Sequence, residues 1–560
     1  MAVVSAAPSV LIVGAGPTGL VAACTLLRHG VDCRVVDVRG GPAREPKALI
    51  LWAGALEALR RTGVSDEIEE AALPLERASY WSRGRRLGMV RFAGLAGTAF
   101  PQPLCAPQPV TEHALYRRLL DLGGTVEWGV EATSCVATSE HATVVLEHGT
   151  TRNGERGRRE EVTVPWLIAA DGARSAVRGV LGIPFEGGAY DRDFLLGDVT
   201  LDGPAPVGEA QYHFTPQGVL VVVPLPGGGH RIFFDEEPGA GTGVPDRDLL
   251  QRLLDERGPG RLTIGTIAWQ SRFHVQTRMA GRFRHGRAFL AGDAAHCHSP
   301  AGGQGLNTGV QDGFDLGWKL AAVLRGADDA LLDGYEAERR PASATAVRNA
   351  ERQTRLWLVR SSILRAGRDV LLRGLSRSGA LERKLVPQLA QLHLDLSASP
   401  AIASAGVPAG VPGTVRPGRR MPDAALSPVR GTAAATLHDY LAQGRHTLVI
   451  AGDRGDGDAE RLAAECREAI LTAGADDLAD VLLILRSAGT APPPDVPYEP
   501  PGVPYDVVRD VGGALTSAAA PWAAYVRPDG VVGSCLDART ALESGASPLP
   551  FPFDRVSAPR

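Results

Sequence analysis

The stretch VLIVGAGPTGLVAA at residues 10–23, followed by VVD at residues 35–37, decides the fold of the first part of this chain. The apolar run Val10–Val13 predicts a buried strand, and the residues after the glycines predict a helix. Gly14 permits a tight turn, Gly16 lets the backbone approach a pyrophosphate, and Gly19 lets strand and helix pack closely. Asp37 ends the next predicted strand, where its carboxylate can accept hydrogen bonds from ribose hydroxyls. The pattern predicts a dinucleotide site formed by Gly14, Ala15, Gly16, Pro17, Thr18, Gly19, Asp37, Val38 and Arg39.

Composition limits the classes of protein to which the chain can belong. Its 560 residues include 59 Lys and Arg against 63 Asp and Glu, so the formal net charge is −4. This near balance provides no basic field for nucleic-acid binding. The length predicts two to four domains at about 100–200 residues each. The seven cysteines are odd in number and form no C-x-x-C pair, so we expect neither a disulfide framework nor a bound metal.

The N-terminal segment lacks the features of a signal peptide. The first cationic side chain is Arg28, so the positively charged n-region is missing. The apolar run from Val10 to Leu27 is interrupted by three glycines and Pro17, which favours a strand, a turn and a helix over a membrane span. We therefore expect a cytoplasmic protein that does not bind membranes.

The composition changes near residue 400, where Ala, Pro, Gly and Ser dominate and strand or helix signals are few. We interpret residues 396–436 as a linker and residues 437–560 as a further domain. In that domain the pattern predicts strands at 446–452 and 480–485, a helix at 458–473, and a hairpin that turns at Pro528-Asp529-Gly530. Alternating strands and helices indicate a small α/β domain.

A second motif, RAFLAGDAAHCHSPAGGQGLNTGVQD at residues 287–312, follows the same logic of a strand, a glycine-rich loop and a helix. It resembles the signature of the class A flavoprotein monooxygenases, the superfamily of para-hydroxybenzoate hydroxylase and phenol hydroxylase. The resemblance implies that Asp293 binds a ribityl hydroxyl of FAD and that the helix N-terminus faces the flavin pyrimidine. The residues that it assigns to the cofactor are Gly292, Asp293, Pro300, Gly303, Gly305, Leu306 and Asn307. His296 and His298 have no ligand spacing for a metal.

Two further segments resemble the same superfamily. The sequence DGARSAVR at residues 171–178 is similar to its D-G-x-x-S-x-V-R motif, which implies roles for Asp171 and Arg178 near FAD and the transient nicotinamide donor. Gln108 matches a glutamine that reaches the FAD phosphates or ribityl chain. Where the family usually has Arg-Ala, this chain has Lys47-Ala, so either Lys47 or Arg44 is expected to contact the pyrophosphate.

The resemblance implies an α/β fold with a Rossmann-like FAD-binding domain of the GR2 type, an inserted β-rich substrate domain and a thioredoxin-like C-terminal domain. The C-terminal part of this expectation rests on PGRRMPD at 417–423 and YVRPDG at 525–530. The expected boundaries are 1–75, 104–186 and 277–395 for the FAD-binding domain, 76–103 and 187–276 for the substrate domain, 396–436 for the linker and 437–560 for the last domain.

The implied activity is hydroxylation of a polycyclic phenol, an aromatic polyketide, through a flavin C4a-hydroperoxide in natural-product biosynthesis. NADPH or NADH would supply electrons and O2 the oxygen atom. The motifs do not distinguish this from Baeyer–Villiger insertion, oxidative rearrangement or an oxidase reaction on the same fold, and a non-catalytic flavin-binding partner protein is a further alternative. The family contains monomers and homodimers, and the sequence does not choose between them.

No side chain is assigned as a catalytic base. We expect the backbone around Pro300, Gly303 and Gly305 to border the reacting flavin edge. Substrate contacts are expected from apolar and aromatic residues of the β-rich segment and of the shorter insertion, although packing within the sheet core is an equally good interpretation of each. These candidates are Trp81, Tyr212, Phe214, Val221, Val223 and Phe234.

Overall fold

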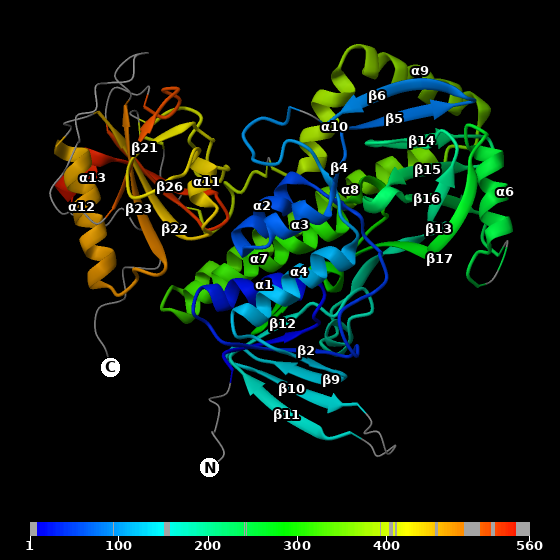
Figure 1. The fold of residues 1–560 in the computed structure, drawn as a ribbon. Coiled ribbons are helices and arrows are strands. Elements are labelled where there is room, and N and C mark those ends of the chain that lie inside the picture. Colours follow the sequence, from blue (N-terminus) through cyan, green and yellow to red (C-terminus); the bar gives the residue numbers. More distant parts are fainter. Residues whose placement is uncertain are drawn as a thin grey trace.

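The structure is a computed structural model that describes residues 8–92, 94–149, 157–239, 241, 243–392, 394–402, 407–408, 411–453, 457–486, 505–516 and 521–544. Its centre is a six-stranded sheet in the order β18-β19-β12-β1-β2-β8 (Figure 1). The strand β1 pairs in parallel with both β2 and β12. Its four residues are buried because helices cover one face of the sheet and a small three-stranded sheet, residues 130–164, covers the other (Figure 1). The strands are β1 (Val10–Val13), β2 (Cys33–Asp37), β8 (Val126–Trp128), β12 (Trp166–Ala169), β18 (Arg284–His285) and β19 (Ala288–Leu290).

Two long helices cross this sheet side by side and bring the two glycine-rich loops together. Helices α1 and α7 approach closely because α7 carries glycines at the contact: a Cβ on Gly313 would lie 2.3 Å from the carbonyl oxygen of Thr18. The helices of this domain are α1 (Pro17–Arg28), α2 (Ala53–Thr62), α3 (Ser65–Ala71), α4 (Gln108–Asp121), α5 (Ala176–Val180), α7 (Gly305–Leu324) and α8 (Asp333–Trp357). Two three-stranded sheets complete it, β11 (Arg159–Val164), β10 (Ala142–His148) and β9 (Val130–Ala137), and β3 (Ile50–Leu51), β7 (Leu104–Cys105) and β4 (Leu73–Pro74).

An eight-stranded sheet forms the second layer of the molecule, at the right of Figure 1. Its order is β20-β17-β13-β16-β15-β14-β5-β6, so the segment before residue 92 and the segment from 185 to 280 join in one sheet. Its strands are β5 (Arg77–Ser82), β6 (Arg85–Arg91), β13 (Phe185–Asp202), β14 (Glu209–Phe214), β15 (Val219–Pro224), β16 (His230–Glu236), β17 (Thr263–Ala280) and β20 (His296–Cys297). Helix α6 (Arg247–Arg257) packs on one face, and α9 (Ser362–Arg377) and α10 (Ala380–Ala390) lie beside β6.

The C-terminal domain is a six-stranded mixed sheet in the order β21-β24-β23-β22-β25-β26, at the left of Figure 1. The predicted strands, helix and hairpin are present as β22 (His446–Gly452), β23 (Ala479–Arg486), α12 (Gly457–Thr472) and the pair β25 (Trp522–Val526) and β26 (Val532–Asp537). The remaining elements are β21 (Leu426–Arg430), α11 (Leu437–Leu441), β24 (Asp506–Asp510) and α13 (Ala538–Ser544). The strand β21 corrects the expected boundary, since it lies within the segment predicted as a linker; its Pro428 is tolerated because β21 is an edge strand.

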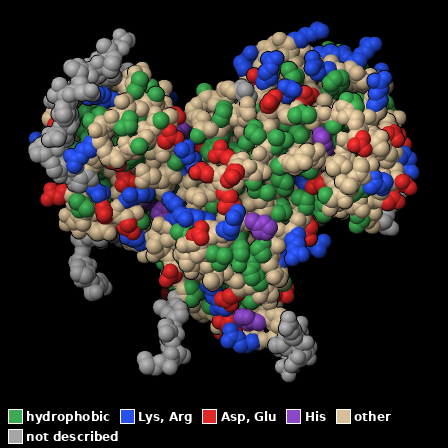
Figure 2. Space-filling view, in the orientation of Figure 1, with side chains coloured by type: hydrophobic (Ala, Val, Ile, Leu, Met, Phe, Trp, Pro, Cys, Tyr) green, Lys and Arg blue, Asp and Glu red, His purple; other side chains and the backbone are tan. Residues whose placement is uncertain are grey.

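The C-terminal domain docks on α2, α7 and α8 through ion pairs. Arg527 binds Glu338 of α8 with two contacts of 2.8 and 2.7 Å, and both side chains are 1% exposed. Arg325 binds Asp477 in the same bidentate way, at 2.7 and 2.9 Å, but at the surface. On the face in Figure 2, acidic and basic side chains are interspersed over most of the surface, and Lys and Arg gather above α9. Within the described ranges, no helix combines the length and the apolar character that crossing a bilayer requires.

Candidate cofactor and substrate site

The first glycine-rich loop leaves open space at one position and is tightly packed at the two others. Gly14 has φ +105, and a Cβ there would lie 2.3 Å from the carbonyl oxygen of Ala170; a Cβ on Gly19 would lie 1.9 Å from that of Gly14. A Cβ on Gly16 would meet no atom within 4 Å. Gly16 is the N-cap of α1 and no side chain caps this helix, so the backbone N–H groups of its first turn face the open space. This is a cradle for a phosphate group.

Asp37 braces the loop in addition to ending β2. Its carboxylate accepts the N–H of Ala15 at 2.7 Å and the N–H of Arg39 at 2.7 Å. Arg39 in turn binds the buried carboxylate of Glu112 at 2.8 Å. Val38, beside them, is 63% exposed, so its side chain is free to cover a ring of a bound cofactor.

The second glycine-rich loop carries Asp293 and packs against the first glycine-rich motif. Gly292 has φ +59 and sits against Thr18 of the first loop, where a Cβ would lie 2.5 Å from Oγ1. Asp293 is exposed to solvent, and no hydrogen bond to its carboxylate occurs among the described residues. The protein atoms around it nevertheless raise its pKa by desolvation, and the charges of His296 and Lys47 oppose this shift. Lys47 and Arg44 are both exposed, and of the two Lys47 is the one whose charge acts on the pKa of Asp293.

A buried cluster of Asp312, His296 and Arg339 holds this loop in place, and sequence reasoning missed it. Asp312 of α7 accepts hydrogen bonds from the N–H of Gly292 at 3.1 Å, from His296 Nε2 at 2.6 Å and from Arg339 Nε at 2.7 Å. Burial would raise the pKa of Asp312, but Arg339 and His296 outweigh it and the pKa falls. His296 is thus committed to Asp312. Its place in the motif was visible in the sequence, but its partner was not.

The start of α7 is held in place by Asn307. Its side chain donates to the carbonyl oxygens of Ile50 at 2.8 Å and Gly303 at 2.6 Å, and its Oδ1 accepts the N–H of Trp52 at 2.6 Å. No side chain caps α7, so the N–H groups of Gly305 and Leu306 are available to a ligand. Asn307 itself is a brace for the loop.

His298 lies beside the same helix start and was not predicted as a site residue. Its ring lies 3.8 Å from the position of a Cβ on Gly305. Its Nδ1 pairs with the carbonyl oxygen of Ser299, and its Nε2 is buried without a partner in the described structure. Burial lowers the pKa of His298 to about 4, so the ring is neutral at physiological pH. Pro300, two residues further on, is exposed.

The remaining predicted cofactor residues have mixed surroundings. Gln108 begins α4 and accepts the N–H of Ala48 at 3.3 Å, which places it beside Lys47. Asp171 accepts the N–H of Val177 at 3.2 Å, while its second oxygen is buried without a partner. Desolvation raises the pKa of Asp171. Arg178 is occupied by backbone carbonyl oxygens, those of Ala294 at 2.9 Å and Ala173 at 2.9 Å, so it connects the two motifs.

The predicted substrate residues are divided between the two faces of the eight-stranded sheet. Tyr212, Phe214, Val221 and Val223 belong to the apolar cluster on the face toward α8, α9 and the FAD-binding fold. Tyr80, Phe233 and Trp357 join them there and were not predicted. Trp81 and Phe234 are separated from this group: Trp81 stacks on His213, and Phe234 packs with Leu220 and Leu250 beneath α6. The expectation that these two residues line the same pocket is thereby corrected, because alternate residues of a strand point to opposite faces.

Comparisons with known proteins agree with this geometry. A family model described as "FAD binding domain" matches residues 8–350, more than half of the chain. A 6-methylpretetramide 4-monooxygenase of Streptomyces rimosus is 36% identical over 474 residues, which cover 83% of this chain and 82% of that protein. The solved structure of the flavin-dependent monooxygenase PieE with FAD and substrate aligns with TM-score 0.77 and 26% identity over 96% of this chain and 98% of that one. CabE, an aromatic hydroxylase from angucycline biosynthesis, aligns with TM-score 0.71 and 27% identity over 95% and 96%.

Proposed function

The chain belongs to the FAD binding domain family and is an FAD-dependent monooxygenase, and from this premise we propose that it hydroxylates a polycyclic phenol of the aromatic polyketide class at the expense of NAD(P)H and O2. The open space in front of Gly16, together with the unpartnered carboxylate of Asp293, carries the proposal. Both are what a bound FAD requires: a backbone cradle for the pyrophosphate and an acceptor for a ribityl hydroxyl.

Bound FAD would supply the redox chemistry, accepting electrons from the nicotinamide donor and activating O2 for transfer of one oxygen atom to the substrate. The protein's part is to bind and orient. Asp37 holds the first loop, Asn307 and Asp312 hold the second, and the N-termini of α1 and α7 supply partial positive charge. We assign no side chain as a general base. The expected alternatives, Baeyer–Villiger insertion and oxidative rearrangement, use the same cleft, and no contact in it favours them.

The substrate contacts are proposed to come from the face of the eight-stranded sheet that points toward α8, α9 and the FAD-binding fold, called the inner face below. Tyr80 and Tyr212 stack there with ring centroids 5.3 Å apart, and Trp357 lies 5.6 Å from Tyr212. Burial raises the pKa of Tyr212 to about 12, so it is a neutral phenol near pH 7. An apolar wall of aromatic rings suits a flat polycyclic ligand. We also propose that the C-terminal domain is thioredoxin-like without a redox cysteine pair.

The test is a turnover experiment with the FAD-loaded protein, NADPH or NADH, and 18O2, over a panel of polycyclic phenols. We expect substrate to accelerate consumption of one nicotinamide donor and one labelled oxygen atom to enter the product. The replacement Tyr212→Ala on the inner face should raise KM, and Trp81→Phe on the outer face should leave it unchanged. Formation of hydrogen peroxide with no labelled product from any phenol would show an oxidase instead.

A further inference from the structure

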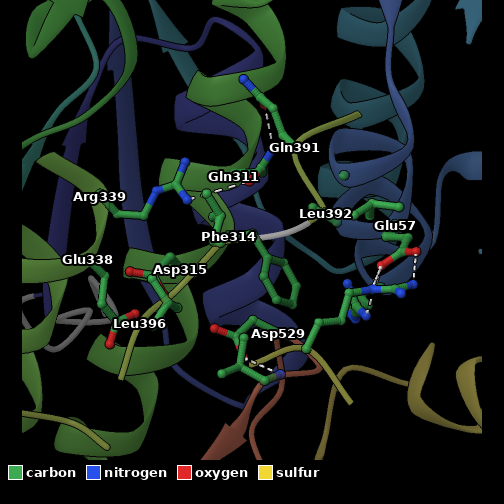
Figure 3. Close-up of a pocket in the computed structure, with 16 residues that line it drawn as sticks. Glu57, Gln311, Phe314, Asp315, Glu338, Arg339, Gln391, Leu392, Leu396 and Asp529 are labelled. Carbon is green, nitrogen blue, oxygen red and sulfur yellow. Dashed lines mark hydrogen bonds and ion pairs between the residues drawn. The ribbon is translucent and has the colours of Figure 1, made fainter. Parts of the chain in front are cut away.

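A second cleft lies where the C-terminal domain meets the FAD-binding fold (Figure 3). It contains about 630 Å³ of space not filled by atoms, part of it open to solvent. Helices α2, α7 and α8, the residues Gln391, Leu392, Leu394 and Leu396, and the turn that contains Asp529 form its walls. In Figure 3 the apolar side chains of Phe314 and Leu392 lie between two charged groups, with Asp315, Glu338 and Arg339 on one side and Glu57 on the other. The cleft is separate from the glycine-rich loops, because none of their residues lines it.

The carboxylates of this cleft already have their hydrogen bonds. Asp315 receives Lys319 Nζ on both oxygens, at 2.8 and 2.7 Å. Glu338 receives Lys319 and both terminal nitrogens of Arg527. Asp529 accepts Arg527 Nε at 3.2 Å and the N–H of Val531 at 3.1 Å. These three carboxylates lie close enough together to bind a metal ion. The side-chain cations of Lys319 and Arg527 already bind them instead.

Two of the three arginines in the wall are satisfied as well. Arg420 donates to both carboxylate oxygens of Glu57 and to the carbonyl oxygen of Gly97. Arg339 donates to Asp312 at 2.7 Å and to the carbonyl oxygen of Thr308 at 3.3 Å. Their guanidinium groups therefore serve to build the wall.

Arg61 is different. It is 6% exposed, its ion pair with Glu57 is a long contact of 3.5 Å, and its Nε is buried without a hydrogen-bond partner among the described residues. Desolvation lowers its pKa, opposed by Glu57. The opposite turn leaves room for it, since a Cβ on Gly530 would lie 2.7 Å from Arg61 Nη2. A buried guanidinium with unused donors is costly unless a ligand accepts them.

We propose that this cleft is an anion site in which Arg61 binds a small oxyanion, a phosphate or carboxylate group, between the FAD-binding fold and the C-terminal domain. The lining carries four carboxylates against three guanidinium groups, so the site is defined by hydrogen-bond capacity and not by net charge: the carboxylates already accept hydrogen bonds, whereas Arg61 Nε donates none among the described residues. A guanidinium fork matches the geometry of two oxyanion oxygens. The apolar wall beside it accommodates the organic part of a carboxylate or phosphate ester.

The test uses the FAD-loaded protein, so that the cofactor's own phosphate cradle is filled. Thermal unfolding is followed during titration with inorganic phosphate and, separately, with phenyl phosphate, at constant ionic strength held with sodium chloride. Both oxyanions should raise the midpoint of the wild-type protein, and a lower half-saturating concentration for phenyl phosphate would identify an organic anion. Arg61→Gln should abolish the rise. Arg60→Gln, which removes the neighbouring 2.9 Å pair with Asp439 across the same junction, should retain it.

A second readout separates binding from support of the fold. Without phosphate, Arg61→Gln should unfold at the same or a higher temperature than wild type, because it removes a poorly compensated buried charge. Arg61→Lys, which keeps the charge but loses the fork, should in addition raise the half-saturating phosphate concentration at least tenfold in calorimetry. Equal phosphate effects in all variants, no effect in wild type, or a large drop of the phosphate-free midpoint in Arg61→Gln would each overturn the proposal.

Discussion

Replacing Gly16 by alanine is expected to separate cofactor binding from folding. Its backbone φ of −74 suits alanine, and the added Cβ meets no atom within 4 Å. The free energy of unfolding of the apoprotein should therefore change by less than about 0.5 kcal/mol. The same methyl group projects into the space in front of the α1 N-terminus, where the pyrophosphate is expected. Loss of one charge-assisted hydrogen bond costs about 1.5–3 kcal/mol, which corresponds to a roughly 10- to 100-fold rise in the Kd for FAD.

Gly14→Ala in the same loop is the matched control. Gly14 has φ +105, and a Cβ would lie 2.3 Å from the carbonyl oxygen of Ala170. This strain is stored in the fold itself, at about 1–3 kcal/mol or more, so the apoprotein should lose stability before any cofactor is added. FAD titration followed by flavin fluorescence gives the Kd, and thermal unfolding of the apoproteins gives the stability. The reasoning is refuted if Gly16→Ala destabilises the apoprotein as much as Gly14→Ala does, or leaves the Kd for FAD within threefold of wild type.

Three further outcomes are expected. Asp293→Asn should leave the thermal midpoint of the apoprotein nearly unchanged, since the side chain is exposed to solvent, and weaken FAD binding about tenfold; unchanged FAD affinity would remove Asp293 from the site. Arg527→Met removes both hydrogen bonds of a buried bidentate pair, leaves Lys319 to balance the buried carboxylates of Glu338 and Asp315, and should cost about 3–5 kcal/mol, seen as faster amide exchange in the β25–β26 hairpin. Arg325→Met breaks an equally bidentate but exposed pair and should cost less than about 1 kcal/mol; similar costs would contradict the role of burial. Burial lowers the pKa of His446 from 6.5 to about 3, so on acidification the unfolded chain takes up this proton before the folded chain does. The free energy of unfolding should therefore fall by up to about 1.4 kcal/mol per pH unit as the pH drops from 6.5 toward 3. If a His446→Gln variant shows the same slope in urea unfolding, this explanation is ruled out.

The sequence predicted the elements whose signals are local. The two glycine-rich loops, the strands that precede them and the C-terminal hairpin all depend on residues within about 25 positions of one another, and the structure has them in place. It did not predict which face of the sheet Trp81 and Phe234 occupy. Alternation along a strand divides the residues between two faces, but it does not say which face packs on the FAD-binding fold and which does not. The second role of Asp37, as a brace for Ala15, was hidden for a related reason: a carboxylate's partner depends on a loop 22 residues away.

Contacts between distant segments were beyond sequence reasoning altogether. Arg527 and Glu338 are 189 positions apart, and no pattern in either segment indicates the other. The same holds for Asp312, whose motif was visible while its partner Arg339 lay on the next helix. The strand β21 was missed because it contains Pro428. Proline is tolerated in an edge strand but not in a central strand, and the sequence does not show which position a strand takes in its sheet.

Helix α7 has a consequence for protein engineering. It runs 20 residues, about 30 Å, from the second glycine-rich loop past the buried Trp318 and Lys319. Trp318 packs against His446 of the C-terminal domain, and Lys319 binds Glu338 of α8, which in turn binds Arg527 of that domain. Deleting the C-terminal domain would leave an indole and an ammonium group of the FAD-binding fold without their cover. Chimeras that exchange substrate preference between relatives should therefore transplant β13 to β17 and keep α7, α8 and the C-terminal domain from a single parent.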